Sequence, residues 1–584
     1  MSSLLQSKFK QTLIDNLIDK IDSPVVSVTI NAGGSQYANG ELLVFDSDDG
    51  TGAAGRVFTN GNGAIEYIAL TARGNYVVKP TVTVDTANGV GASLTAVVEN
   101  DHFYVFAGRA DPYANEFEPD VAYENDYDAH FYQYDHMLFG KKVSNTDIAI
   151  MARRVQWTSN TEYAEYDDRD QELPSKDFFV ITDDYHVFKC IYNNLDAPST
   201  VQPANTSSST LPATLADGYR WQYMYTVPAG DRSKFITQNY VPLKDDATVI
   251  ANAANGAILN IKVEVAGSEY PCHSNSIVAT SNGSNLVIVG TGASTVQDYY
   301  ANCTLTVFGA GNVVTNRRIA SSYDDNGSRT LILANTFNAN QIAAGYTYSI
   351  APSLDVDGDG ADFEGYLVMN ANNGAIVRAE IVDGGQDYAR ATANVVSGTA
   401  FGSGADLRPI ISPPGGHGAN ARGELYARHL CVSATFANTM TGGQPTEMKY
   451  RSIGLLKNPE PYTGNTQVTG VDFNQTVTLT VANTSTKVFD SGEIILGNVS
   501  GARMIVAFSN SSIAKVTAYP ADGEDPIIGE VLTGQESGAQ FTLTNIGDAP
   551  DLKAFSGEVL YIQNVEPIQR SNTASEQCKL VIRL

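Results

Sequence analysis

Residues 25–37, VVSVTINAGGSQY, lead at 49–55 into DGTGAAG, and this pairing of a strand-like stretch with a glycine-rich turn returns along the chain. A second copy, IEYIALTARGNY, ends at Tyr76, thirty-nine residues after Tyr37, and leads into NGVGAS. In both copies a Gly-Ala pair stands fifteen positions after the tyrosine; the pairs are Gly52-Ala53 and Gly91-Ala92. Alternating Val, Ile and Thr around glycine-rich turns predict that each copy folds as a few short strands.

Two further copies lie in the middle of the chain. ILNIKVEVAGSEY ends at Tyr270, but DGDGAD, which we take as its partner through Gly360-Ala361, comes much later. We therefore interpret residues 272–350 as a β insertion nested within this copy. The next copy ends at Tyr388 and reaches its Gly-Ala pair at Gly404-Ala405. Repeats of this size commonly bury their apolar faces against one another.

A second repeat family lies near the C-terminus. A Gly-Glu dipeptide precedes a Ser-Gly-Ala tripeptide twice, with the same offset and a period of thirty-seven residues. The copies are Gly492-Glu493 with Ser500-Gly501-Ala502, and Gly529-Glu530 with Ser537-Gly538-Ala539. Short strands joined by small-residue turns are again predicted.

The composition excludes several classes of protein. The chain has 584 residues, enough for about four folded units, and a formal net charge of −27 from 64 acidic and 37 basic residues. No dense basic cluster exists, so we expect no nucleic-acid partner. Only 17% of residues are charged and 43% are hydrophobic, which is too apolar for a disordered chain. The balance is that of a turn-rich β protein.

The cysteines and the apolar runs bear on location. Five cysteines are scattered without a CxxC motif, which fits assembly in a reducing cytoplasm and disfavours a zinc site. No run of about eighteen apolar residues appears, and the N-terminus lacks a signal sequence, so neither membrane insertion nor signal-peptide secretion is expected. Residues 7–21 carry an apolar stripe at helical spacing and predict a short N-terminal helix.

Three motifs have residue patterns that could bind a cofactor or a metal ion. GTGAAG matches a dinucleotide-binding pattern, but no helix follows it, so we assign its glycines to the repeat turn. Asp355, Asp357 and Asp359 have the spacing of a calcium loop, yet Tyr366 replaces the closing Glu; we favour an ordinary repeat turn, with calcium as the weaker alternative. His130 and His136 lie among aspartates at a spacing that favours a solvated acidic loop. No nucleophile-base pairing supports an enzyme.

Several short segments occur in a defined order. They are QSKFKQTLIDNLIDKI at 6–21, YVFAGRADPY with Arg109, IAIMARRVQW with Arg153, Arg154 and Trp157, VFKCIYN at 187–193, DGYRWQYMYTVP with Asp217, Gly218, Tyr219 and Trp221, NYVPL at 239–243, and the closing stretch at 556–582 with Gly557, Glu558 and Tyr561. Together they resemble the eighth gene product of T-even-type contractile-tailed bacteriophages, a baseplate wedge subunit. The resemblance covers about 1–24, 100–247, 413–470 and 548–584, somewhat under half of the chain.

This resemblance implies a structural protein of the virion without catalysis or cofactor. Family members are homodimeric, mainly β proteins that join neighbouring wedge subunits of the tail baseplate, which assembles in the host cytoplasm and reorganises on host attachment. Decorated versions with inserted repeats resemble those of T-even-like phages of marine cyanobacteria. We expect Arg109, Arg153, Arg154 and Trp221 to have buried structural roles.

The expected fold is mainly β, with a multi-domain β-sandwich-like core, a short N-terminal helix and inserted glycine-rich β-repeat domains. The expected segments are the helix at 1–24, repeats at 25–99, core at 100–250, repeats at 251–412, core at 413–484, a second repeat pair at 485–547 and C-terminal core strands at 548–584.

Two classes of function remain open at this point. The first is the baseplate wedge strut, whose partners would be a second copy of itself and other wedge proteins. The second is a tail-associated adhesin whose inserted repeats bind a host-surface glycan, motivated by the Gly-Asp-rich turns and the many aromatic residues. A depolymerase enzyme ranks third.

Overall fold

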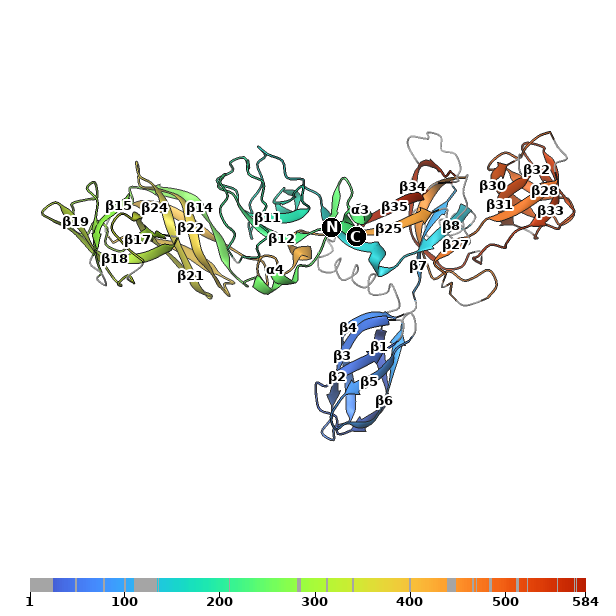
Figure 1. Ribbon diagram of the computed structural model, residues 1–584, viewed down its shortest axis with the longest axis horizontal. Helices are drawn as coiled ribbons and strands as arrows, with labels where there is room; N and C mark the ends of the chain where they lie inside the picture. Colours follow the sequence, from blue (N-terminus) through green and yellow to red (C-terminus); the bar gives the residue numbers. More distant parts are fainter. Residues whose placement is uncertain are drawn as a thin grey trace, which may run out of the picture. The chain divides into compact units, whose positions relative to one another are not determined.

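The computed structural model describes residues 25–583 except 48–49, 77–78, 99–100, 110–133, 135, 210, 281–284, 311–312, 339–340, 399–400, 438–447, 465–466, 469, 483–485, 511–513, 523, 554, 572 and 574. The helix expected at 7–21 and the loop around His130 lie outside the described residues. The expectation of a mainly β chain is confirmed, because about 55% of the chain is strand and 5% helix. Two compact units are present, one formed by 1–149 with 428–584 and the other by 150–427 (Figure 1).

The first unit contains a five-stranded sheet in the order β27-β8-β7-β26-β34. Its strands are β7 (Phe103–Gly108), β8 (Met137–Lys142), β26 (Lys449–Lys457), β27 (Asp472–Asn474) and β34 (Glu558–Gln569). Every residue of β7 is buried, as expected for a central strand covered on both faces. A second antiparallel pair joins β25 (His429–Ala437) to β35 (Ser575–Arg583). Two neighbouring pairs, β7 with β26 and β8 with β27, join segments more than 300 residues apart in sequence.

The second unit begins with a smaller β core. The three-stranded sheet β10-β11-β12 consists of β10 (Phe179–Ile181), β11 (His186–Tyr192) and β12 (Arg220–Thr226). Nearby, β13 (Tyr240–Pro242) pairs with β9 (Ile148–Arg153). The short helices of this unit are α3 (Ala229–Phe235), α4 (Ala247–Asn252) and α5 (Ala421–Glu424), with the 3-10 turn η2 (Leu173–Ser175); a second 3-10 turn, η1 (Asn145–Asp147), belongs to the first unit. Aromatic and aliphatic side chains of β10, β11 and β12 fill the core between them.

The two N-terminal repeats fold together as one module. The first repeat supplies β1 (Val25–Ser35), β2 (Leu42–Asp46) and β3 (Gly50–Thr59), and the second supplies β4 (Ile65–Tyr76), β5 (Thr81–Asp85) and β6 (Val90–Val98). Most of the strand pairing crosses between the repeats, because β1 pairs with β6, β2 with β5 and β3 with β4; within the first repeat β2 also pairs with β3 at Leu42 and Arg56. Neither repeat pairs its first strand within itself, so each one needs the other to complete its sheets.

The repeats in the second unit build a module with the same pairing. Its strands are β14 (Ile258–Ser268), β20 (Thr347–Gly358), β21 (Ala361–Asn370), β22 (Ala375–Gln386), β23 (Ala391–Val396) and β24 (Ser403–Ile411). Here β14 pairs with β24, β20 with β23 and β21 with β22. These pairs correspond in order to β1-β6, β2-β5 and β3-β4. We call the segment 25–98 module 1 and the segment 258–411 module 2.

Module 2 carries a nested β insertion. It consists of β15 (His273–Thr280), β16 (Leu286–Val289), β17 (Cys303–Phe308), β18 (Val314–Asp325) and β19 (Ser328–Leu333). The first half of β20 pairs with β15 and β17 inside the insertion, and its second half, from Ser353 to Gly358, pairs with β23 of the module. The insertion has its own apolar core of buried aliphatic and aromatic side chains.

The repeat tyrosines explain the exchange of partners. The Tyr37 hydroxyl oxygen accepts a hydrogen bond from the backbone N–H of Ala92 at 3.2 Å, and Tyr76 accepts one from Ala53 at 3.0 Å. Each tyrosine therefore bonds to the glycine-alanine turn of the other repeat. In module 2, Tyr270 accepts from Ala405 at 3.2 Å in the same way.

A glycine three or two residues before each tyrosine makes this contact feasible. Gly34, Gly74, Gly267 and Gly385 all have φ between +62° and +64°. A Cβ on any of them would lie within 3.0 Å both of the tyrosine ring and of the backbone of the facing strand. Only glycine combines this backbone conformation with such a close approach.

One detail of the predicted alignment is wrong. The residues that face these glycines are Gly52, Gly91 and Gly404, all at positive φ, and in the third copy the facing residue is Asp362, with φ +66°. The equivalent of Gly52-Ala53 is therefore Asp362-Phe363 rather than Gly360-Ala361. Gly360 corresponds instead to the earlier glycine of the turn, where a Cβ would meet the Tyr388 ring at 2.5 Å.

The C-terminal repeats close into a six-stranded barrel, β28-β31-β30-β29-β32-β33. The strands are β28 (Val477–Ala482), β29 (Ile494–Gly497), β30 (Arg503–Asn510), β31 (Lys515–Asp522), β32 (Val531–Gly534) and β33 (Gln540–Ile546). Residues 477–482 thus belong to the barrel, although we assigned 413–484 to the core. Closure pairs the edges that an open six-stranded sheet would leave free.

The two Glu residues of the barrel repeats also exchange partners. Buried Glu493 accepts hydrogen bonds from the backbone and hydroxyl of Ser537, and buried Glu530 accepts them from Ser500 and Val499. Burial by itself would raise the pKa of both carboxyls, but these hydrogen bonds outweigh it and hold each pKa below its ordinary value. The repeated Gly-Glu and Ser-Gly-Ala motifs are thus the two halves of one contact.

Candidate functional site

Asp217, the first residue of the DGYRW motif, holds the segment 199–201 of the second unit through hydrogen bonds. One Asp217 oxygen accepts hydrogen bonds from the Ser199 hydroxyl and the backbone N–H groups of Thr200 and Val201, at 3.1, 2.8 and 2.9 Å. Burial would raise the Asp217 pKa, but these backbone donors lower it overall. The Trp157 indole N–H donates to the same Ser199 hydroxyl at 3.2 Å, so two motifs distant in sequence share one serine.

The neighbouring motif residues are also structural. Tyr219 is fully buried, stacks on Trp221 with ring centroids 5.5 Å apart, and donates its hydroxyl to the Ala197 carbonyl at 2.5 Å. Burial raises the Tyr219 pKa to about 12. Gly218 has φ +84°, and a Cβ there would meet the Asn194 amide at 2.5 Å. The DGYRW motif therefore holds a turn and a core, and Trp221 is buried as expected.

The motif arginines differ from one another in exposure and partners. Arg109 donates to the Val506 carbonyl of the barrel at 3.2 Å, and Arg154 donates to Thr237 at 3.1 Å. Arg153 pairs with Asp177 at 2.8 Å but leaves 42% of its side chain exposed. The expectation that Arg153 is buried is therefore wrong, because its guanidinium lies at the wall of an open cavity.

The motif at the C-terminal end positions the edge of the first sheet. Gly557 has φ +82° and lies against the Lys457 carbonyl, where a Cβ would stand only 2.6 Å away. Glu558 begins β34 opposite Lys457, and the Tyr561 hydroxyl donates to Gln563 at 3.0 Å. These residues belong to the first unit, whereas Asp217 and Trp157 belong to the second.

The calcium candidates are engaged separately. Asp355 pairs with Arg318 at 3.3 Å, Asp357 accepts from the Asn394 amide at 2.8 Å, and Asp359 accepts from the backbone of Ala389 and Arg390. Asp355 and Asp357 lie along the extended strand β20 rather than around a loop. Among the residues that the structure describes, no group of three His, Cys, Asp or Glu side chains stands at metal-binding geometry.

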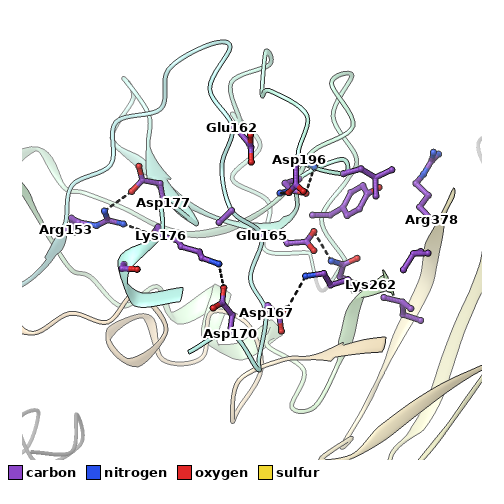
Figure 2. Close-up of a pocket in the computed structure, with 18 residues that line it drawn as sticks. Arg153, Glu162, Glu165, Asp167, Asp170, Lys176, Asp177, Asp196, Lys262 and Arg378 are labelled. Atoms are coloured by element: carbon purple, nitrogen blue, oxygen red, sulfur yellow. Dashed lines mark hydrogen bonds and ion pairs between the residues drawn. The ribbon is translucent and has the colours of Figure 1, made fainter. Parts of the chain in front are cut away.

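The second unit contains an open cavity of about 690 Å³. Figure 2 shows charged side chains of both signs around it, contributed by the end of β9, the loop 162–177, the segment after β11 and the strands β14 and β22. The charged lining residues are Arg153, Glu162, Glu165, Asp167, Asp170, Lys176, Asp177, Asp196, Lys262 and Arg378. Sequence reasoning did not predict this cluster, because its members are brought together only by tertiary folding.

Most of these charges are matched within the chain. Lys176 pairs with Asp170 at 2.7 Å, and Asp167 receives two bonds from Arg408 of β24, at 2.5 and 3.0 Å. Burial would raise the Asp167 pKa, but Arg408 lowers it. Glu165 differs, because burial raises its pKa despite the amide of Asn260, which donates to it at 3.2 Å. These ion pairs and hydrogen bonds fasten the loop 162–177 to module 2. The arrangement fits a structural role better than a catalytic one.

A second charged pair is fully enclosed. The Lys189 ammonium contacts the Glu424 carboxylate, which also accepts from the backbone of Gly418 and Asn420 at 2.8 and 3.2 Å. Burial lowers the Lys189 pKa, and Glu424 opposes that effect. Since both side chains are almost completely buried, they have no access to a substrate, and the pair fixes α5 against β11.

No protein-family model matches this chain, and no curated protein matches it. Within the described part of the chain, no helix is both long enough and apolar enough to cross a membrane.

Proposed function

We propose that this protein is a structural subunit of a contractile phage tail baseplate, a homodimeric strut that links neighbouring wedge subunits. The observation that carries the proposal is the placement of the segments that resemble the wedge family. Residues 103–108, 449–457 and 558–569 form neighbouring strands β7, β26 and β34 of one sheet, and 429–437 pairs with 575–583. The segments that resemble the wedge family therefore pair with one another in the same sheets, in addition to occurring in the family's order along the sequence.

The segments outside the resemblance form separate folded bodies. Module 1 pairs its six strands only with one another in the described chain, and so does the barrel. Insertions that begin and end close together on a sheet leave the parent strands paired. This arrangement supports a wedge-like core that carries added modules.

The motif residues and the cavity fit a strut. Asp217, Tyr219, Trp157 and Arg154 stabilise loops and cores, and the charges at the cavity tie a loop to module 2. A strut in a baseplate must transmit force between its interfaces, which favours many long-range polar contacts inside each unit. We infer that the partners are a second copy of this chain and other wedge proteins, within the virion.

Light scattering of the purified protein tests the proposal. We expect the mass of a dimer alone, and a larger stable complex when the other wedge subunits from the same genome are added. A deletion of 25–98 removes no strand from the core sheets and is expected to leave the dimer mass intact. A monomer that ignores every wedge subunit would contradict the proposal.

One observation favours a second candidate, a tail-associated adhesin that binds host glycans. Phe58 and Tyr67 lie side by side on module 1 with ring centroids 5.7 Å apart, and both are exposed. Exposed aromatic rings can stack on sugar faces. A glycan array probed with the full chain and with the Tyr67→Ala variant tests this candidate, and array binding that needs Tyr67 would favour it.

A further inference from the structure

The outer face of module 1 is apolar and bare. Leu42 and Val44 on β2, Phe58 on β3 and Tyr67 on β4 are 48%, 44%, 38% and 61% exposed. The strand register places them on one face, because Leu42 is paired with Arg56, Phe58 with Tyr67, and alternate residues of a strand share a face. The opposite face of the same sheet packs into the core of the module.

In module 2 the nested insertion covers part of the equivalent face: Ser353 is 3% exposed, whereas the Asp355 side chain stays 41% exposed. The matching pairings of β2-β5 and β20-β23 align Leu42 with Ser353 and Val44 with Asp355, and those of β3-β4 and β21-β22 align Arg56 with Tyr366. All three module 2 positions contact the nested insertion. Ser353 bonds to Thr304 at 2.7 Å, Asp355 pairs with Arg318 at 3.3 Å, and Tyr366 meets the Phe308 ring at 6.0 Å.

The cover in module 2 is therefore a pair of antiparallel strands of a folded β domain, β17 and β18. Arg378, which occupies the position of Tyr67, is also engaged, since it bonds to Glu380 at 2.6 Å and lines the cavity. Module 1 has no insertion between its first tyrosine and β2, so the same face stays open. The two modules thus present the same surface once partly covered by the insertion and once bare.

The charge on the bare face indicates what the cover must carry. Arg56 is exposed and donates to the Gly40 carbonyl at 2.8 Å, but it forms no ion pair with the described part of this very acidic chain. It stands between Leu42 and Phe58 on the face. A partner that buried these apolar side chains would need a carboxylate opposite Arg56, because an unpaired buried charge is costly.

We propose that this face of module 1, defined by Leu42, Val44, Arg56, Phe58 and Tyr67, docks a β-rich protein that presents apolar side chains around one carboxylate. The covered face of module 2 favours a folded protein over a sugar as the occupant. Aromatic and arginine side chains at the centre of the face are the residue types that dominate such interfaces. The proposal rests on the proposed function for its partner, which is another protein of the baseplate.

Binding measurements on the full chain test this surface. Each wedge subunit from the same genome is expressed separately and used as the probe against wild type, Tyr67→Asp and Arg56→Glu. We expect one subunit to bind wild type, and each variant to weaken that binding at least about tenfold. The matched control is Val90→Asp, since Val90 is 58% exposed on β6, away from this face; its affinity should stay within about twofold of wild type.

The following outcomes overturn the proposal, and one further result, described last, supports it. Equal binding by wild type and both face variants removes the docking surface and leaves the wedge function standing. Failure of wild type to bind any wedge subunit removes both. Self-association lost in Tyr67→Asp, or glycan-array binding lost in that variant, assigns the face to a second copy or a sugar instead. Restoration of Arg56→Glu binding by a partner Asp→Arg or Glu→Arg substitution would identify the facing carboxylate.

Discussion

Modules 1 and 2 share the same strand exchange and differ in what they carry. In both, tyrosines and left-handed glycines connect one repeat to the turn of the other. Module 2 accommodates a complete β domain between Tyr270 and Ser353, whereas module 1 crosses the same interval with a short loop. The comparison teaches that the exchanged contacts hold the module together, while the connection after the first tyrosine is free to grow. Surface connections tolerate insertions because loop closure entropy rises slowly with length.

The largest effect is expected from the tyrosines that define the comparison. Tyr37→Ala and Tyr270→Ala remove large buried rings and should each destabilise their own module by about 3–5 kcal/mol. The matched Phe variants lose only the hydrogen bond and should cost about 1 kcal/mol. Peptide-level hydrogen exchange on the full chain measures each module separately. If a variant lost hydrogen-exchange protection only in the strands of one repeat, the exchanged architecture would be contradicted.

The glycines should follow in size. Gly74→Ala and Gly385→Ala force an alanine into positive φ and place its Cβ 2.3 Å from facing backbone atoms. The left-handed conformation alone costs about 1–2 kcal/mol, and the clash adds to it. Gly61→Ala is the control, since nothing lies within 4 Å of the added Cβ. The same hydrogen-exchange assay applies, and equal protection in Gly61→Ala and Gly74→Ala would refute the steric argument.

The barrel is a third duplicated region with exchanged contacts, and its stability should depend on pH. Glu493 and Glu530 have folded pKa values below the ordinary value, so deprotonation favours the folded barrel. That stability is present above the ordinary value of about 4.3 and is lost as pH falls through the lowered folded pKa. Glu530→Gln should cost about 1–3 kcal/mol near neutral pH, because hydrogen bonds to a charged group are lost. Urea unfolding should show this difference narrowing in acid; a constant difference at all pH values would contradict it.

A smaller change sharpens the alignment of the modules. Asp362 is the one residue at its position that is not glycine, and it has φ +66°. Asp362→Gly should therefore relieve backbone strain and stabilise module 2 by up to about 1 kcal/mol, while Gly52→Asp in module 1 should destabilise it. Thermal melting combined with hydrogen exchange measures the change in module stability for each variant. Destabilisation by Asp362→Gly together with stabilisation by Gly52→Asp would contradict the alignment.

The smallest effect concerns the bare face. Val44→Asp installs the residue that module 2 has at Asp355 and should change stability by no more than about 0.5 kcal/mol, because Val44 is exposed. Asp355→Val removes a half-exposed pair with Arg318 and should cost about 0–1 kcal/mol. A large loss from Val44→Asp in the isolated protein would mean that this face is already covered by the chain itself.

Part of the fold was predictable from sequence because its signals are local. Alternating β-branched residues predicted strands, the glycine-tyrosine spacing identified the repeats, and the long interval after Tyr270 indicated a nested insertion. The exchange between repeats was not predictable. The same repeat sequence would allow each tyrosine to bond to the turn of its own repeat or to the turn of the other repeat. The error at Gly360 arose because the αL position was occupied by Asp362, and a Gly-Ala pair nearby imitated the motif.

The candidate sites divide in the same way. Asp217, Tyr219, Trp157 and Gly218 were singled out from motifs, and the structure assigns them structural contacts. The cavity network, the Lys189–Glu424 pair and the bare face of module 1 were missed. Each depends on residues far apart in the chain, or on which of two equivalent faces is covered.

The sequence by itself determined a turn-rich β chain with duplicated units, because strand alternation and turn chemistry act over a few residues. Only the tertiary structure decided which repeat completes which sheet and which charges meet at the cavity. It also decided that the face around Arg56 and Tyr67 stays bare while the nested insertion packs on part of its counterpart in module 2. These outcomes depend on pairing and burial between distant segments, whose free energies no local pattern records.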